Sequence, residues 1–211
     1  LDSLQPIGPS ERERFAFATI GVVSNLERAM LNTAQAYAFA RQEGKKRVLV
    51  RWRLRLTGLA AQSVSAAHVD ELYASEPCLW GYFVHGAPCV ITDNIAQGKG
   101  LVNGTQGKMH SLVMGKTSSG QDGQRELRAL LERAHPGSVV TLSEPPKYIN
   151  VIPTVIDKFK DLLRPDSLAQ DCVVVPVGQD PRTEEFKPTS TFAAMYGIGV
   201  PLRRRKKNGT L

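Results

Sequence analysis

Long apolar runs are absent from this sequence of 211 residues. No segment approaches the roughly 18 consecutive apolar residues that a membrane-spanning helix needs. The first residues also lack the basic and then apolar pattern of a secretory signal. Hydrophobic residues nevertheless make up 42% of the chain, which is enough for a sizeable core. The sequence therefore predicts a globular protein that makes no contact with a membrane.

Cysteine is scarce, and no C-x-x-C pair occurs. The three cysteines lie far apart, and the four histidines show none of the spacings that are typical of zinc ligands. We therefore expect no metal site, and three reduced thiols that pack as small apolar groups in an intracellular protein, in the nucleus if the source is a eukaryote. The residues concerned are Cys78, Cys89, Cys172, His68, His85, His110 and His135.

Known catalytic motifs are missing as well. Gly115-Lys116-Thr117 looks like the end of a phosphate-binding loop, but the motif needs a Gly five positions before Gly115, where this chain has His110. The following segment, Ser118 to Gly123, consists of loop formers, so the required strand, loop and helix context is absent. No G-x-S-x-G, H-E-x-x-H or paired-carboxylate site occurs either. We therefore predict no catalytic residues, and the chain does not encode a self-contained enzyme.

The sequence carries a surplus of positive charge. Lys and Arg number 27 against 20 Asp and Glu, a net charge of +7, and the isoelectric point is about 9.5. Such a surplus favours a polyanionic partner such as nucleic acid. Residues 179–211 are assigned to a C-terminal basic tail. Its final run, Arg203 to Lys207, is interpreted as a solvated segment, a localisation signal or a nucleic-acid contact.

The beginning of the chain predicts a strand followed by a helix. Residues 1–14 are expected to form an N-terminal arm. The apolar segment Phe15 to Val23 is typical of a strand buried on both faces. Ser24 or Asn25 can cap a helix that runs from Leu26 to about Gly44. The apolar stripe expected to face the core consists of Leu26, Met30, Ala34, Tyr37 and Ala38.

The next segment, Lys45 to Leu56, alternates between apolar and basic residues, which predicts a half-buried strand. Two interpretations of its basic face stay open. It is either a solvated strand face or a ladder that contacts phosphates, since guanidinium groups pair well with phosphate oxygens. The apolar side consists of Val48, Val50, Trp52, Leu54 and Leu56, and the basic side of Arg47, Arg51, Arg53 and Arg55.

A second helical pattern runs from Val64 to Phe83, and Pro77 is expected to break it into two pieces. His68 and His85 are interpreted as half-buried polar residues without a catalytic role. Together with the preceding strands and helix, this segment predicts an α/β unit over residues 15–85.

The composition changes at Gly86, where short strands and frequent Gly and Pro begin. Cys89 to Ile91 and Met109 to Val113 predict the two strands of a hairpin, with a broad loop and a tight Asn103-Gly104 turn between them. A helix is expected from Arg125 to Ala134. Further short strands are expected on both sides of Pro145-Pro146 and at Cys172 to Val177, with a brief helix or an irregular segment at Thr154 to Leu163. Residues 86–178 therefore predict a small β-barrel.

The hairpin sequence also resembles a known family. Gly86 to Leu112 is similar to the segment of petite-integration-frequency (Pif) type superfamily-one DNA helicases, including Helitron-like helicases, in which an apolar strand ends in Asn and a Gly-Leu-x-Asn-Gly-Thr turn follows. Here these parts are Ile91 to Asn94 and Gly100 to Thr105. The upstream segment Thr19 to Phe39 is similar to the strand, Asn and helix at the start of the family's second RecA-like domain.

Downstream, the segments around Pro145-Pro146 and Cys172 to Val177 resemble the closing strands of the SH3-like barrel inserted in that domain. The resemblance thus spans about residues 15 to 178. It implies a partial second RecA-like domain at 15–85 and an SH3-like barrel at 86–178.

The resemblance also implies what the chain lacks. The family's phosphate-binding loop and its Asp-Glu magnesium motif lie in a first RecA-like domain, for which this chain has no counterpart. The family's late Lys-x-Gln-Gly-x-Thr motif is matched at most in a degenerate form, at Lys206 to Leu211. The chain begins with Leu1 rather than Met, which favours an excised or processed piece. We therefore expect no cofactor in this chain, whereas ATP and Mg²⁺ are implied for a full-length helicase.

For this chain the resemblance implies contact with single-stranded DNA, and a missing N-terminal helicase domain as a second partner. Barrel loops can hold a strand through basic side chains and stacking aromatic rings. The turn residues Asn103 and Gly104 are more strongly expected to shape the turn than to touch DNA. The residues predicted by position to contact DNA are Lys99, Asn103, Lys108, His110, Lys147 and Tyr148.

Two functions from different classes stay open at this point. The chain is either the accessory, DNA-contacting region of an ATP-dependent helicase, or a stand-alone, non-catalytic module that binds nucleic acid or protein. Both predict the same contact residues, so the sequence does not separate them.

Overall fold

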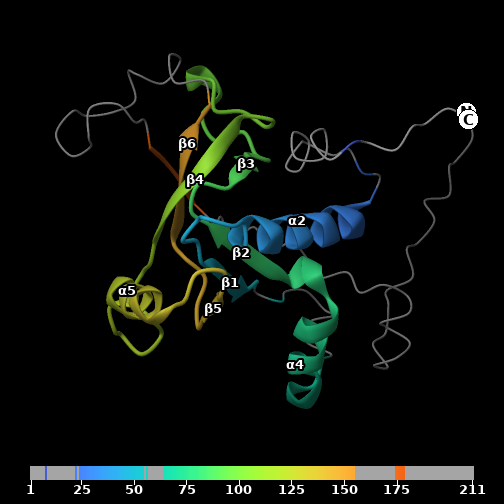
Figure 1. The fold of residues 1–211 in the computed structure, drawn as a ribbon, viewed down its shortest axis with the longest axis vertical. Coiled ribbons are helices and arrows are strands. Elements are labelled where there is room, and N and C mark those ends of the chain that lie inside the picture. Colours follow the sequence, from blue (N-terminus) through green and yellow to red (C-terminus); the bar gives the residue numbers. More distant parts are fainter. Residues whose placement is uncertain are drawn as a thin grey trace, which may run out of the picture.

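The computed structural model describes residues 24–54, 64–154 and 174–178, together with residues 8, 22 and 56. These residues form a mixed α/β structure with two β-sheets (Figure 1). Strands β2, β1 and β5 lie in that order in a three-stranded sheet, and β3, β4, β6 and β7 form a four-stranded sheet. The α-helices of the described residues are α2 (Asn25–Ala40), α4 (Ala66–Ser75) and α5 (Gly123–Arg133).

Helix α2 begins as the sequence predicts, but it buries a different face. Ser24 is the N-cap, and its hydroxyl and the Glu27 carboxylate form a capping box. The helix ends at Ala40, a few residues before Gly44. Its last turn carries the buried residues Phe39 and Ala40. The predicted core stripe is wrong, because the helix packs on the sheet through its C-terminal end. Of that stripe, Leu26, Met30, Ala34 and Ala38 are exposed, and only Tyr37 packs against the core.

Strand β1 (Leu49–Arg53) is the central strand of the three-stranded sheet. It pairs antiparallel with β2 (Trp80–Val84) and parallel with β5 (Val139–Leu142). The prediction of helix up to Phe83 is therefore wrong after Ser75. Pro77 begins the short 3-10 helix η1 (Pro77–Leu79). The aromatic and β-branched residues that follow it favour a strand over a helix.

The predicted hairpin is confirmed. Strand β3 (Pro88–Val90) pairs antiparallel with β4 (Gln106–Val113). Between them lie the 3-10 helix η2 (Gln97–Lys99) and the turn that contains Gly104, whose φ is +92°. Glycine suits this position because it has no Cβ to clash with the backbone at positive φ.

The four-stranded sheet continues from β4 to β6 (Tyr148–Pro153) and then β7 (Val175–Gly178), all antiparallel. The predicted strands on both sides of Pro145-Pro146 are thus β5 and β6, and the predicted helix is α5. Neither sheet of the described residues closes into a barrel. The barrel prediction is therefore not borne out in the described residues, because β5 pairs with β1 of the three-stranded sheet and not with a strand of the four-stranded sheet.

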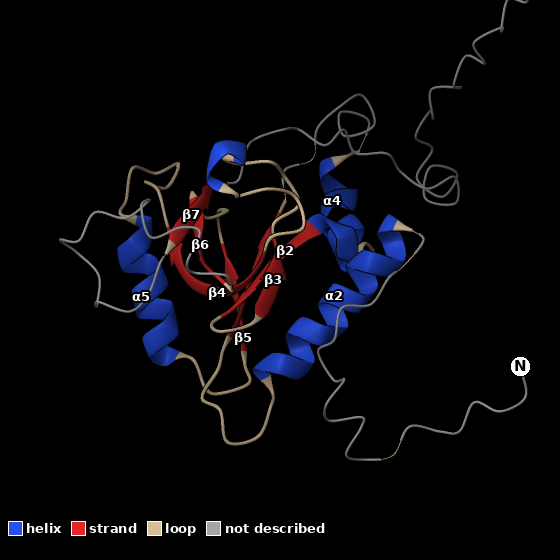
Figure 2. Cartoon of the chain, turned by 90° about the horizontal axis from the view of Figure 1, so that it is seen from above, coloured by secondary structure: helices blue, strands red, loops and turns tan. Residues whose placement is uncertain are grey.

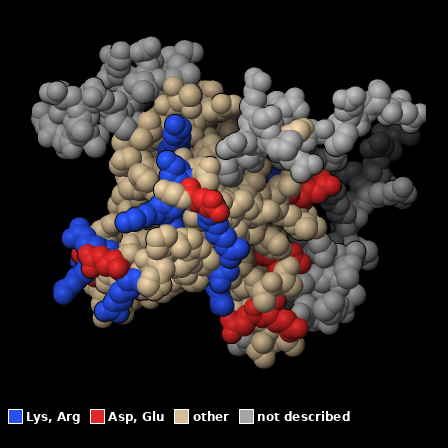
Figure 3. Space-filling model, viewed as in Figure 1, with Lys and Arg blue, Asp and Glu red and all other residues tan. Residues whose placement is uncertain are grey.

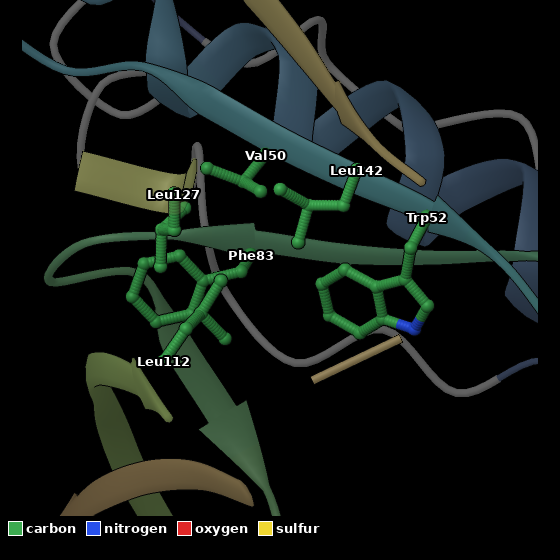
Figure 4. Close-up of a cluster of buried hydrophobic side chains, with 6 residues drawn as sticks. All are labelled: Val50, Trp52, Phe83, Leu112, Leu127 and Leu142. Atoms are coloured by element: carbon green, nitrogen blue, oxygen red, sulfur yellow. The ribbon is translucent and has the colours of Figure 1, made fainter. Parts of the chain in front are cut away.

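The two sheets pack on one another through a shared core. Val50, Trp52 and Phe83 of the three-stranded sheet meet Leu112 of β4 and Leu127 of α5 (Figure 4). The other face of the three-stranded sheet is covered by α2, through Phe39 and Ala40. Figure 2 shows the strands at the centre, with α5 on one side and α2 and α4 on the other. The three-stranded sheet is thus covered on both faces.

Several predictions concern residues outside the described ranges. They include all but Val22 of the strand at 15–23, and the segments 155–163 and 203–207. The division into units at residues 85 and 86 stays a prediction, although β5 from beyond that point pairs with β1. Within the described residues, no helix is long and apolar enough to cross a membrane.

Gly81 provides a test of this packing, because the Trp52 indole lies directly against it. A Cβ added at Gly81 would stand 2.3 Å from Cε2 and 2.4 Å from Nε1 of Trp52. We expect Gly81→Ala to lower the free energy of unfolding by about 1–3 kcal/mol through overpacking. Chemical denaturation followed by tryptophan fluorescence measures the change.

Gly98→Ala is the matched control, since nothing lies within 4 Å of an added Cβ at Gly98. Its effect is expected to stay within about 0.5 kcal/mol. Equal stabilities of the two variants would contradict the packing of Trp52 on Gly81.

Candidate nucleic-acid interface

The four-stranded sheet has an inner face that joins the core and an outer face that points away from the other sheet. On the inner side, Met109 and Leu112 of β4 and Ile149 of β6 pack into the core. Since side chains alternate along a strand, Tyr148 and Asn150 of β6 point outward. The outer face is defined here by β4 and β6, which pair directly.

Four of the six predicted contact residues lie on or beside this outer face. Lys108 and His110 belong to β4, Tyr148 begins β6, and Lys147 precedes it. Lys108 is paired with Ile152, four residues along β6 from Tyr148. At a rise of about 3.3 Å per residue, the Lys108 and Tyr148 positions are ~13 Å apart along the sheet. Both lysines are exposed, and His110 and Tyr148 are half-buried.

A β-bulge shapes the middle of the face. The register between β4 and β6 shifts between Met109 and Ser111, which makes His110 the extra residue. Its Nδ1 lies 3.0 Å from Oγ of Ser111. The Asn150 amide donates to the same hydroxyl oxygen at 2.9 Å. The bulge therefore places an imidazole in a polar network at the centre of the face.

Lys147 and Tyr148 form the other end of the face. The Lys147 ammonium lies 5.3 Å from the centroid of the Tyr148 ring, within cation–π range. The ring also passes over Gly178 of β7, since a Cβ at Gly178 would lie 3.6 Å from it. A cation beside a part-exposed aromatic ring is the pairing used to hold a phosphate and stack a base.

The two remaining predicted residues lie elsewhere. Asn103 is in the turn before β4, and its backbone N–H donates to Oδ1 of Asn94 at 3.0 Å. The next residue, Gly104, donates its N–H to the carbonyl of Ile91 at 2.8 Å. These contacts give Asn103 a part in forming the turn. Lys99 ends η2, and its side chain lies outside the described residues.

A small cavity of about 110 Å³ adjoins Lys147. It lies between the β4–α5 connection, which carries Gly115-Lys116-Thr117, and the β5–β6 connection, which carries Glu144. Contrary to the sequence interpretation, a strand does precede these three residues and a helix does follow them. The loop nevertheless differs from a phosphate-binding loop, because Glu144 accepts from the Ser118 N–H at 2.6 Å. An internal carboxylate therefore already uses the N–H that follows Thr117.

The arginine face of β1 bears on both interpretations made from the sequence. Arg47 lies 3.8 Å from the Phe39 ring centroid, and Arg51 lies 4.3 Å from that of Trp80. Arg53 stacks on Tyr73 at 4.7 Å. Arg53 is exposed and Arg47 and Arg51 are half-buried, so this face is partly solvated as one interpretation expects, and its guanidinium groups also contact neighbouring aromatic rings. Arg55 lies outside the described residues.

One thiol and two histidines differ from expectation. Cys78 is exposed rather than packed, and Cys172 lies outside the described residues. Burial raises the pKa of the Cys89 thiol to about 11, so this residue stays protonated at neutral pH. His68 and His85 are exposed rather than half-buried.

The charged side chains are unevenly distributed over the surface. Figure 3 shows mostly basic side chains over and near β4, with an acidic group beside them, both signs over α5, and acidic side chains at the far end of α4. Asp70 of α4 pairs with Arg53 at 2.8 Å. The region that holds β4 therefore presents positive charge for a polyanion.

One contact of this region could not be found from spacing. His85 and His110 are 25 residues apart, yet Nδ1 of His85 lies 2.7 Å from the His110 carbonyl oxygen. The β3–β4 pairing brings them together, which a search for short histidine motifs does not detect.

Comparison of the chain with protein-family models, curated proteins and solved structures gave no match.

Arg51 tests whether the arginines of β1 are structural. Its Nε donates to Thr141 Oγ1 at 3.0 Å, and its Nη1 donates to the Tyr37 hydroxyl at 3.4 Å. We expect Arg51→Gln to lower the free energy of unfolding by about 1–2 kcal/mol, because both hydrogen bonds and the stacking on Trp80 weaken. Urea denaturation measures this loss.

Arg28→Gln removes the same charge from an exposed position of α2 and serves as the control. It is expected to change stability by less than about 0.5 kcal/mol. The structural role would be refuted if Arg51→Gln left stability unchanged and weakened DNA binding more than the control does.

Proposed function

We propose that this chain binds single-stranded DNA across the outer face of its four-stranded sheet. Within a cell, it serves as the accessory, DNA-contacting region of an ATP-dependent helicase of the Pif type. The observation that carries the proposal is the placement of Lys108, His110, Lys147 and Tyr148 on or beside two directly paired strands.

The chemistry of this face suits a flexible strand rather than a specific sequence. Exposed Lys108 and Lys147 can neutralise phosphates at the two ends of the face. The ring of Tyr148 offers one stacking platform, and every base has a π-face that can use it. The hydroxyl and amide of Ser111 and Asn150 already bond to each other, which limits base-edge readout there. Binding should therefore tolerate different sequences.

The position of the face also favours this function. The other sheet is covered by α2 on one side and by the four-stranded sheet on the other. Arg51 and Arg53 of that sheet already contact aromatic rings, and Arg53 also pairs with Asp70. Within the part of the chain that the structure describes, Lys108 and Lys147 form no such ion pair with a carboxylate, and both are exposed.

The first test is the affinity for a fluorescent oligothymidine, measured by anisotropy at several salt concentrations. Affinity should fall steeply with salt, because bound lysines release counterions from the strand. Lys108→Gln and Lys147→Gln should each reduce the slope of log K against log salt by about 0.7. Tyr148→Ala should weaken binding by about 1–3 kcal/mol through loss of stacking.

Lys45→Gln and Lys46→Gln provide matched controls, because both side chains are exposed in the connection before β1. They should leave the salt slope near that of the wild type. An affinity of the wild type that does not change with salt, or no binding at low salt, would contradict the proposal.

The second test concerns hydrolysis. The chain alone, with Mg²⁺, ATP and single-stranded DNA, should show no turnover above a no-protein control, since Glu144 already uses the Ser118 N–H of the loop that resembles a phosphate-binding loop. A coupled ATPase assay measures this. Robust turnover by the isolated chain would contradict the assignment as an accessory region.

A further inference from the structure

Two histidines from separate strands meet beside the outer face. His85 lies directly after β2, and His110 is the extra residue of the bulge in β4. Their ring centroids are 6.0 Å apart, with an interplanar angle of 61°.

The hydrogen bonds of the pair determine which nitrogen is available. Nδ1 of His85 faces the His110 carbonyl oxygen at 2.7 Å, and a carbonyl can only accept. His85 must therefore carry its proton on Nδ1, which leaves the lone pair of the neutral ring on Nε2. Donation of one ring N–H to a backbone carbonyl is the arrangement that fixes metal-binding histidines.

His110 can adopt the same tautomer. Its Nδ1 lies 3.0 Å from Oγ of Ser111, and this oxygen also accepts from the Asn150 amide. A hydroxyl oxygen has two lone pairs, so it can accept from both donors. With the proton on Nδ1 of His110, the lone pair of this ring also lies on Nε2.

We propose that His85 and His110 together bind one divalent transition-metal ion, with Zn²⁺ as the representative ion, through their Nε2 atoms. At Zn–N distances of about 2.0–2.1 Å and a tetrahedral angle, two imidazoles on one Zn²⁺ have centroids about 5 Å apart. The rings, 6.0 Å apart here, would therefore approach by about 1 Å when an ion binds. Imidazole nitrogen is a ligand that suits zinc, copper and nickel. The two rings leave further coordination positions for water or another oxygen ligand.

This inference does not depend on DNA binding, and it departs from the sequence prediction, which expects no metal site. No group of three or more His, Cys, Asp or Glu in the described ranges is placed to hold a metal. A site of two ligands is therefore the largest that these side chains offer, and its affinity should be moderate. Exposure of His85 leaves the pair accessible to an ion from solution.

The test is calorimetric titration of the whole chain with Zn²⁺ under reducing conditions that do not chelate the ion. The wild type should bind about one ion, and His85→Ala and His110→Ala should each weaken binding at least about tenfold. The double variant with His68→Ala and His135→Ala should bind as the wild type does. In NMR spectra, Zn²⁺ should shift the imidazole signals of His85 and His110 and leave those of the other two in place.

Each outcome decides the proposal. Absence of Zn²⁺ binding by the wild type overturns it, as does equal binding by the His85→Ala variant, which would indicate an exposed thiol such as Cys78 as the ligand. An equal loss in the control variant overturns it as well. His110→Ala removes a side chain from the bulge and can disturb the fold, which thermal unfolding of the variant detects. In that case the His85→Ala variant alone decides the test, because His85 is exposed and its replacement should leave the fold intact.

Discussion

The structure depends on the burial of strand β1 on both of its faces. Leu49, Val50 and Trp52 are 0–1% exposed, although arginines alternate with them along the strand. The guanidinium groups are not buried with them: Arg51 is half-buried and Arg53 is exposed. Both contact aromatic rings, and Arg53 also pairs with Asp70. The central strand thus joins the two sheets through its apolar side chains and keeps its arginines at the margin of the core.

This constraint determines which surface is left for a partner. The three-stranded sheet lies between α2 and the four-stranded sheet. The four-stranded sheet contributes only its inner face to the core, so its outer face keeps the side chains of Lys108 and Tyr148 available. The bulge at His110 adds an imidazole and connects it to His85. The same strand pairing therefore supports both the proposed DNA contact and the proposed metal site.

Local signals in the sequence predicted the local elements well. The Ser24 cap with Glu27 near it, the Asn103-Gly104 turn and helix α5 each follow from side chains that act on their own neighbouring backbone. The face of strand β1 that joins the core also followed from its alternation, since Val50 and Trp52 are buried together. Such effects do not require knowledge of the rest of the fold.

The sequence predictions were wrong where contacts with distant segments determine the local structure. The apolar spacing from Val64 onward predicted a helix up to Phe83, whereas Trp80–Val84 is a strand that pairs with β1. The stripe on α2 is exposed at Leu26 and Met30, since the helix meets the sheet only through its last turns. The barrel did not close because β5 pairs in parallel with β1. The contact of His85 with His110 depends on register, which spacing in the sequence does not reveal.

The most direct test of the account is a ¹⁵N NMR titration of the whole chain with a short single-stranded DNA. If DNA binds across the outer face, the largest amide shifts should fall on β4 and the start of β6, around Lys108, His110, Lys147 and Tyr148. Shifts concentrated on α2 or α4, or no shifts at low salt, would contradict the account.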